Sequence, residues 1–149
     1  MTDFSNTDDL IDIRDIFEKI GELEDLIESR QFEIDEIKED TNREIDDELD
    51  MLLAELSDTE SELNILTEFI SDFAGYGGDE EYNGEWYPGT LVRDSYWNDY
   101  CKETCEEIGD IPNNLPSYIE IDWERTAENI QIDYSSGEYD GVTYWGRNS

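Results

Sequence analysis

The sequence predicts an α+β protein in which a long acidic helical hairpin, or coiled coil, precedes a small α+β domain with a C-terminal β-hairpin. Residues 7–74 contain no proline and one glycine, whereas all three prolines and nine of the ten glycines follow them. Apolar residues in this first region recur three and four apart, as in amphipathic helices. We therefore expect helices over 7–75, a glycine-rich, acidic and aromatic loop over 76–89, and a small domain over 90–147.

The apolar residues of the first region form two heptad-like series, a pattern typical of helices that pack along a narrow seam. The series break phase between Ile37 and Ile45, where Thr41 or Asn42 can cap a second helix. This predicts an antiparallel hairpin with arms about 50 Å long. One continuous helix that dimerises as a coiled coil is the alternative. The two series are Ile13, Ile16, Ile20, Leu23, Ile27, Ile34 and Ile37, then Ile45, Leu49, Leu52, Leu56, Leu63, Leu66, Ile70 and Phe73.

Capping and turn residues mark the elements expected after residue 90. Asp140-Gly141 is a turn signal between two short β-prone segments, which predicts the C-terminal hairpin. Asp and Ser are favoured helix N-caps, and glycine ends helices. In chain order we expect a helix capped by Asp94 or Ser95 and ending at Gly109, a short extended piece over 118–121, a helix capped by Asp122, and strands over 131–134 and 142–145.

Several function classes are disfavoured by what the chain lacks. It has no histidine for general-base or triad chemistry and no glycine-rich phosphate loop, so we expect no enzyme and no cofactor. No basic patch is present for direct nucleic-acid binding, and no apolar stretch is long enough to span a membrane. Cys101 and Cys105 lie one helical turn apart, which suits buried thiols better than a disulfide or a metal site.

The acidic excess predicts a basic partner. The chain has 43 Asp and Glu against 9 Lys and Arg, a net charge of -34, which is more than solubility needs. Residues 1–75, which contain the helical region, alone carry a net charge of -21. A duplex about 50 Å long carries roughly 29 phosphate charges, so an acidic hairpin of that length could occupy a DNA-binding cleft. The expected contact residues are Asp46, Asp47, Glu48, Asp50, Glu55, Asp58, Glu60 and Glu62 of the helices, and Asp79, Glu80, Glu81 and Glu85 of the loop.

A structural role is the competing hypothesis. In this hypothesis the helical region is a coiled coil that forms oligomers, such as a homodimer, and the C-terminal unit is a docking module. Inhibition through charge should weaken steeply with salt and be competed by DNA, whereas assembly along an apolar seam should not.

Residues 90–147 resemble the C-terminal part of the ArdA-type antirestriction proteins. The points of likeness are Tyr118, Ile121-Asp122-Trp123-Glu124, Thr126-Ala127-Glu128-Asn129-Ile130, Asp133-Tyr134 and Asp140-Gly141-Val142-Thr143-Tyr144. The resemblance, which extends to small acidic proteins of tailed phages, implies a counter-defence protein in the host-cell cytoplasm that mimics DNA. The implied target is a restriction-modification enzyme, with a CRISPR effector or other defence nuclease as the alternative. This sequence replaces the N-terminal domains of that family with the helical region.

Overall fold

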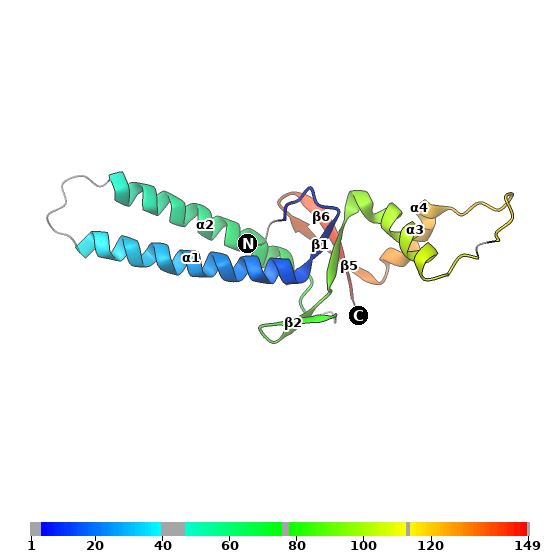
Figure 1. Ribbon diagram of the computed structural model, residues 1–149, viewed down its shortest axis with the longest axis horizontal. Helices are drawn as coiled ribbons and strands as arrows, with labels where there is room; N and C mark the ends of the chain where they lie inside the picture. The colour runs from blue at the N-terminus through cyan, green and yellow to red at the C-terminus, as the bar shows by residue number, and fades with distance from the viewer. Residues whose placement is uncertain (1–3, 40–46, 76–77, 113, 149) are drawn as a thin grey trace.

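The computed structural model describes residues 4–39, 47–75, 78–112 and 114–148. Figure 1 shows an elongated molecule, with two long helices at one end, an antiparallel sheet in the middle and two shorter helices beyond it. The elements in chain order are β1 (Leu10–Asp12), α1 (Ile13–Glu39), α2 (Asp47–Ser71), β2 (Glu80–Tyr82), β3 (Glu85–Tyr87), β4 (Thr90–Arg93), the 3-10 turn η1 (Asp94–Tyr96), α3 (Trp97–Glu107), α4 (Trp123–Gln131), β5 (Tyr134–Tyr139) and β6 (Val142–Arg147).

The two long helices form an antiparallel hairpin rather than one continuous helix. Lys19, near the start of α1, contacts Glu62 in the second half of α2, while Arg30, further along α1, contacts Glu55, earlier in α2. The helices have 27 and 25 residues, so each is about 40 Å long and shorter than expected. The proposed caps Thr41 and Asn42 lie outside the described residues. The buried seam residues of the two helices are Ile13, Ile16, Ile20, Leu23, Ile34, Leu56, Thr59, Leu66, Phe69 and Ile70.

The helical region begins at Ile13, which corrects the expected start at residue 7. Residues 10–12 instead form β1, which pairs antiparallel with β4. The Asp12 carboxylate accepts a hydrogen bond of 2.9 Å from the backbone N–H of Arg14, and this caps α1. The sheet therefore does not belong to residues 90–147 alone, because its edge strand β1 comes from the segment before the long helices.

Residues 76–89 were expected to form a loop, but within their described part the structure has a β-hairpin. Strands β2 and β3 pair antiparallel around Asn83-Gly84, whose φ angles of 51° and 84° are those of a tight primed turn. The Asn-Gly pair was the available sequence signal. Its flanking strands have only three residues each and are acidic, which conceals the alternation that usually identifies strands.

The sheet has strand order β1-β4-β6-β5, with every pairing antiparallel. Because side chains alternate along a strand, Leu91 and Tyr144 lie in the core shared with α1 and α2, while Val92 and Trp145 lie against α3 and α4. The helical hairpin therefore covers one face and the short helices the other. The expected C-terminal hairpin is confirmed as β5 and β6, with Asp140 and Gly141 both at positive φ. Its first strand, expected over 131–134, is instead Tyr134–Tyr139, because α4 continues to Gln131.

Two glycines make room for the end of the helical hairpin on the sheet. A Cβ on Gly137 would lie 2.7 Å from Cε2 of Phe73, and a Cβ on Gly146 would lie 2.9 Å from Cδ1 of the same ring. Phe73 is buried with Phe69 in the core that continues up the helices. The hairpin and the sheet thus share a single packed core at their junction.

The cap predicted for α4 is confirmed, but the one predicted for α3 is wrong: Asp94 and Ser95 lie in η1, and the N-cap position of α3 is Tyr96, whose side chain makes no capping hydrogen bond. Asp122 caps α4 by accepting a hydrogen bond from the backbone N–H of Arg125, and the turn after α3 includes Gly109 at φ 79°. The indole N–H of Trp97 donates to the carbonyl of Ala127 at 2.9 Å, which ties α3 to α4. The extended piece expected over 118–121 contains no strand and is turn and irregular backbone.

We expect the fold to lose stability between about pH 10 and pH 12. Burial raises the pKa of Tyr144 to about 12, and burial likewise raises that of Tyr134 to about 12. The folded state then keeps protons that the unfolded state releases above about pH 10, so stability is full below that pH and falls as pH rises towards 12. The measurement is the urea midpoint at half-unit steps of pH.

The variant that checks this prediction is Tyr144→Phe. It loses the 2.6 Å hydrogen bond that the Tyr144 hydroxyl donates to the carbonyl of Asp8, at a cost of about 1 kcal/mol near pH 8. Its stability should then fall less steeply above pH 10 than that of the wild type. An equal fall in both proteins would show that Tyr144 does not contribute to the alkaline loss.

Candidate protein-partner interface

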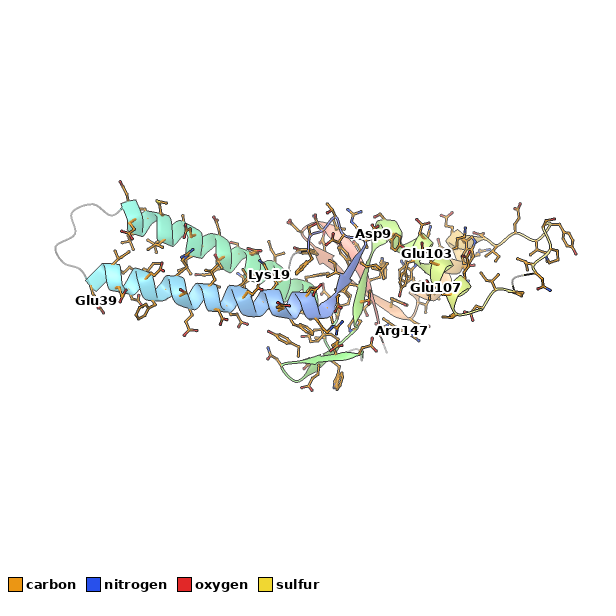
Figure 2. The ribbon with its side chains drawn as sticks, viewed as in Figure 1. Asp9, Lys19, Glu39, Glu103, Glu107 and Arg147 are labelled. Carbon is orange, nitrogen blue, oxygen red and sulfur yellow. The ribbon has the colours of Figure 1, made fainter. Side chains whose placement is uncertain are left out.

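Helix α2 presents an acidic surface and carries no base of its own. Eight of its 25 residues are acidic and none is Lys or Arg. Helix α1 carries ten acids and four bases, and Figure 2 shows Lys19 in its sheet-proximal half and Glu39 at its far end. The acids of α2, all exposed, are Asp47, Glu48, Asp50, Glu55, Asp58, Glu60, Glu62 and Glu68.

Two bases of α1 are used inside the hairpin. Nε of Arg30 lies 3.1 Å from the Glu55 carboxylate and a terminal nitrogen of Arg30 lies 3.5 Å from Glu33, while Nζ of Lys19 lies 4.0 Å from Glu62. We call the side of the hairpin that carries these contacts the paired edge. Glu55 and Glu62 were expected to contact a partner, but each already has an internal cation. The carboxylates are about half exposed, so these pairs are weak and a partner's cation can replace them.

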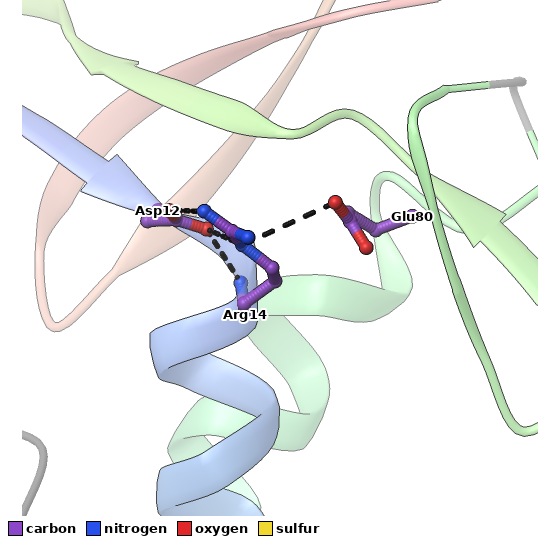
Figure 3. Close-up of polar contacts among 3 residues, drawn as sticks. All are labelled: Asp12, Arg14 and Glu80. Atoms are coloured by element: carbon purple, nitrogen blue, oxygen red, sulfur yellow. Dashed lines mark hydrogen bonds and ion pairs between the residues drawn. The ribbon is translucent and has the colours of Figure 1, made fainter.

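A third base links β1, α1 and β2 (Figure 3). The Arg14 guanidinium donates two hydrogen bonds to the Asp12 carboxylate, at 3.1 and 2.8 Å, and its Nε lies 4.0 Å from Glu80. The side-chain hydrogen bonds from Arg14 hold the pKa of Asp12 below its usual value. Glu80, another expected contact residue, therefore lies beside an internal cation as well.

The acids expected at the start of α2 lie at the far end of the hairpin. Asp47, Glu48 and Asp50 are in the first helical turn, and Asp46 lies outside the described residues. Acidic side chains near a helix N-terminus interact favourably with the helix dipole. Part of their placement thus has a structural reason, although all three remain exposed at the tip of the rod.

The other predicted acids of α2 divide between two sides of the hairpin. Glu55, Asp58 and Glu62 are three and four residues apart, so they share one face, and the ion pairs place that face on the paired edge. Glu60, Leu63 and Thr67 are also three and four residues apart, so Glu60 shares a face of α2 with the other two. Leu63 and Thr67 line a cavity on the opposite side of the hairpin. We call this opposite side the open edge.

The remaining predicted acids lie on or beside the β2–β3 hairpin. Glu81 stands opposite Trp86, and Glu85 stands opposite Tyr82. Trp86 is half exposed, and Asp79 immediately precedes β2. The predicted contact residues within the described part of the chain therefore form separate groups, at the tip, on each edge and on the β-hairpin, rather than one continuous surface.

The open edge has a cavity that the sequence analysis missed. It encloses about 260 Å³ between α1, α2 and the β2–β3 hairpin. Its lining is mainly apolar and includes Ile20, Leu63, Ile70, Tyr82 and Tyr87, with Glu24 at the α1 side. Tyr82 is held in place by stacking on Phe17, with ring centroids 4.3 Å apart. Burial raises the pKa of both lining tyrosines, so their hydroxyl groups are protonated around neutral pH.

A shallower hollow continues the open edge towards the tip. It has a volume of about 420 Å³ and shares Glu24 with the cavity. Phe32 lies on it with 64% of its surface exposed. Spacings of four and seven residues place Glu24, Glu28 and Asp35 on one face of α1, and this spacing was the signal in the sequence that could have identified them. The hollow is lined by Glu24, Ile27, Glu28, Gln31, Phe32 and Asp35.

Other kinds of site find little support in the described residues. No group of three or more Cys, Asp or Glu side chains among them is arranged to hold a metal ion. Cys101 and Cys105 are free thiols, and burial raises the pKa of Cys101 to about 11, so that its thiol is protonated near neutral pH. None of the helices described has the length and apolar character that crossing a bilayer requires.

The chain was also compared with known proteins. No protein-family model, no curated protein and no solved structure gives a match to it.

Proposed function

We propose that the protein is a DNA-mimicking inhibitor that occupies the DNA-binding cleft of a basic host enzyme. The observation that carries the proposal is the surface of α2, with eight exposed acids and no base. Such a surface loses stability through self-repulsion, which the exposed pairs of Glu55 and Glu62 with α1 offset only in part. A cleft lined by Lys and Arg would relieve this repulsion.

The net charge of the two long helices supports mimicry of a short duplex, although the charge per unit length is lower than the sequence predicted. The two helices carry 18 acids and four bases, a net charge of -14, over about 40 Å. A duplex of that length carries roughly 24 phosphate charges. The helices thus present more than half of the net charge of the duplex, with carboxylates one helical turn apart, which Lys and Arg can contact as they do phosphates.

The proposed target is a restriction-modification enzyme or another defence nuclease such as a CRISPR effector, and the proposed site of action is the host-cell cytoplasm. Both rest on the resemblance of residues 90–147 to the ArdA-type proteins and on the need for a basic cleft. The structural alternative, an acidic scaffold, is favoured by no contact among the described residues.

The test is a competition experiment. The tagged protein is immobilised and exposed to bacterial lysate with and without excess duplex DNA, and each retained protein is purified and assayed as a nuclease or DNA-binding enzyme. We expect inhibition that duplex DNA relieves and that weakens at least about tenfold between low and high salt. Retention of partners that are indifferent to DNA, or inhibition that is insensitive to salt, would contradict DNA mimicry.

A further inference from the structure

We propose that the open edge binds a basic amphipathic helix of the partner protein, with two apolar side chains about two turns apart and Lys or Arg beside them. The proposal deepens the proposed function and rests on it for the class of partner. It depends on the cavity and the hollow beside it, and none of the acids of α2 that would imitate phosphates lines either of them.

The spacing of the two hollows suits a helix. The cavity is lined on α1 by Ile20 and Glu24, and the shallower hollow centres on Glu28 and Phe32. Eight residues of α1 separate the two, which is about 12 Å along the axis. A second helix laid along this edge covers the same distance in about eight residues, so two apolar side chains two turns apart would reach both hollows.

The chemistry of each hollow indicates an apolar anchor. The cavity of about 260 Å³ is walled by Ile20, Leu63, Ile70 and two tyrosine rings, and it has room for a Leu, Met or Phe side chain. The second hollow presents the exposed ring of Phe32 beside Ile27. Exposed apolar groups rimmed by polar side chains are typical of protein contact sites.

The charge along the open edge selects a cationic occupant. Glu24, Glu28 and Asp35 line the hollows, and no Lys or Arg is among the residues that line either one. A second copy of this chain would place the same acids against one another, and nucleic acid or anionic lipid would be repelled in the same way. A helix with Lys or Arg flanking its apolar positions satisfies both the charge and the hollows.

The test uses the full chain and a synthetic probe, an alanine-based helical peptide with two leucines about two turns apart and lysines beside them. Binding is measured by isothermal titration calorimetry at about 0.15 M salt. The triple variant Glu24→Gln, Glu28→Gln, Asp35→Asn should weaken binding about tenfold, as expected for three partly solvated ion pairs. The matched control, Glu18→Gln, Asp25→Asn, Glu36→Gln, removes the same charges from exposed positions elsewhere on α1 and should weaken it less than about twofold.

Two further variants test the apolar part of the site. Phe32→Ala removes the exposed ring of the outer hollow, and Thr67→Trp fills the cavity from an exposed position of α2. Each should weaken binding of the leucine peptide severalfold, and a peptide with alanine in place of both leucines should bind poorly to the wild type. Both changes lie at exposed positions, so the fold should survive, which circular dichroism checks.

Three results would overturn the proposal. One is equal weakening by the two triple variants, which would show that only bulk charge matters. Another is that the alanine peptide binds the wild-type protein as tightly as the leucine peptide does, or that neither peptide binds it. The third is that the wild-type protein self-associates in sedimentation experiments and that the triple variant of Glu24, Glu28 and Asp35 changes this self-association. That result would assign the open edge to a second copy of the chain. None of these measurements involves DNA, so they can fail while the competition experiment on the proposed function succeeds, and the reverse.

Discussion

Phe69→Ala should remove about 3–5 kcal/mol from the free energy of unfolding. The Phe69 side chain is fully buried where the helical hairpin meets the sheet. Its ring packs against three others, with centroid distances of 5.6 Å to Phe73, 5.2 Å to Tyr139 and 5.7 Å to Tyr144. Since small domains have a stability of only about 5–15 kcal/mol, the loss should lower the urea midpoint strongly. Circular dichroism during urea unfolding measures it.

The matched control is Phe32→Ala, which removes the same atoms from the other long helix. Because 64% of the Phe32 surface is exposed, this change should alter the free energy of unfolding by less than about 0.5 kcal/mol. A loss below about 1 kcal/mol for Phe69→Ala, or losses of equal size for the two variants, would show that the junction is not the packed core described here.

Neutralising four acids of α2 should reduce affinity for the inhibited enzyme about 30-fold to 1,000-fold. The variant carries Asp47→Asn, Asp50→Asn, Asp58→Asn and Glu60→Gln, all at exposed positions. If each carboxylate contributes about 0.5–1 kcal/mol against a basic cleft, the four together give about 2–4 kcal/mol. The concentration that halves nuclease activity, measured at fixed salt, reports the change.

A control of identical charge lies at the other end of the molecule. Asp99→Asn, Asp110→Asn, Asp133→Asn and Glu106→Gln also remove three Asp and one Glu from exposed positions, but outside the helical hairpin. This variant should inhibit within about threefold of the wild type, because distant charges are screened by salt. Equal losses for the two variants would assign inhibition to total charge instead of to α2. The free energy of unfolding of the α2 variant should change little, because the removal of like charges offsets the lost interaction of Asp47 and Asp50 with the helix dipole.

The helices and the C-terminal hairpin could be predicted because their information is local. The apolar spacing from Ile13 to Leu23 and the turn at Asp140-Gly141 each depend on residues close in the chain. Strand β1 could not be recognised, because three residues show too little alternation and its partner β4 lies about 80 positions away. Its pairing depends on the whole sheet being assembled.

The candidate site was harder to predict than the fold. Composition indicated acidic residues as the main chemical feature, but it could not show that Glu55, Glu62 and Glu80 lie beside internal cations. Those contacts join segments that are distant in sequence. The cavity on the open edge was equally hidden, because its walls come from two helices and a β-hairpin that meet only after folding.

The packing of Phe73 against Gly137 and Gly146 has a consequence for the thermodynamics of association. Because the ring fills the space left by two missing side chains, the root of the rod is anchored in the sheet. The helical backbone that carries its carboxylates is therefore ordered before any encounter. A flexible acidic tail of equal charge would have to order its backbone on binding, at roughly 1–2 kcal/mol for each residue fixed. The anchored rod has already incurred much of that cost during its own folding.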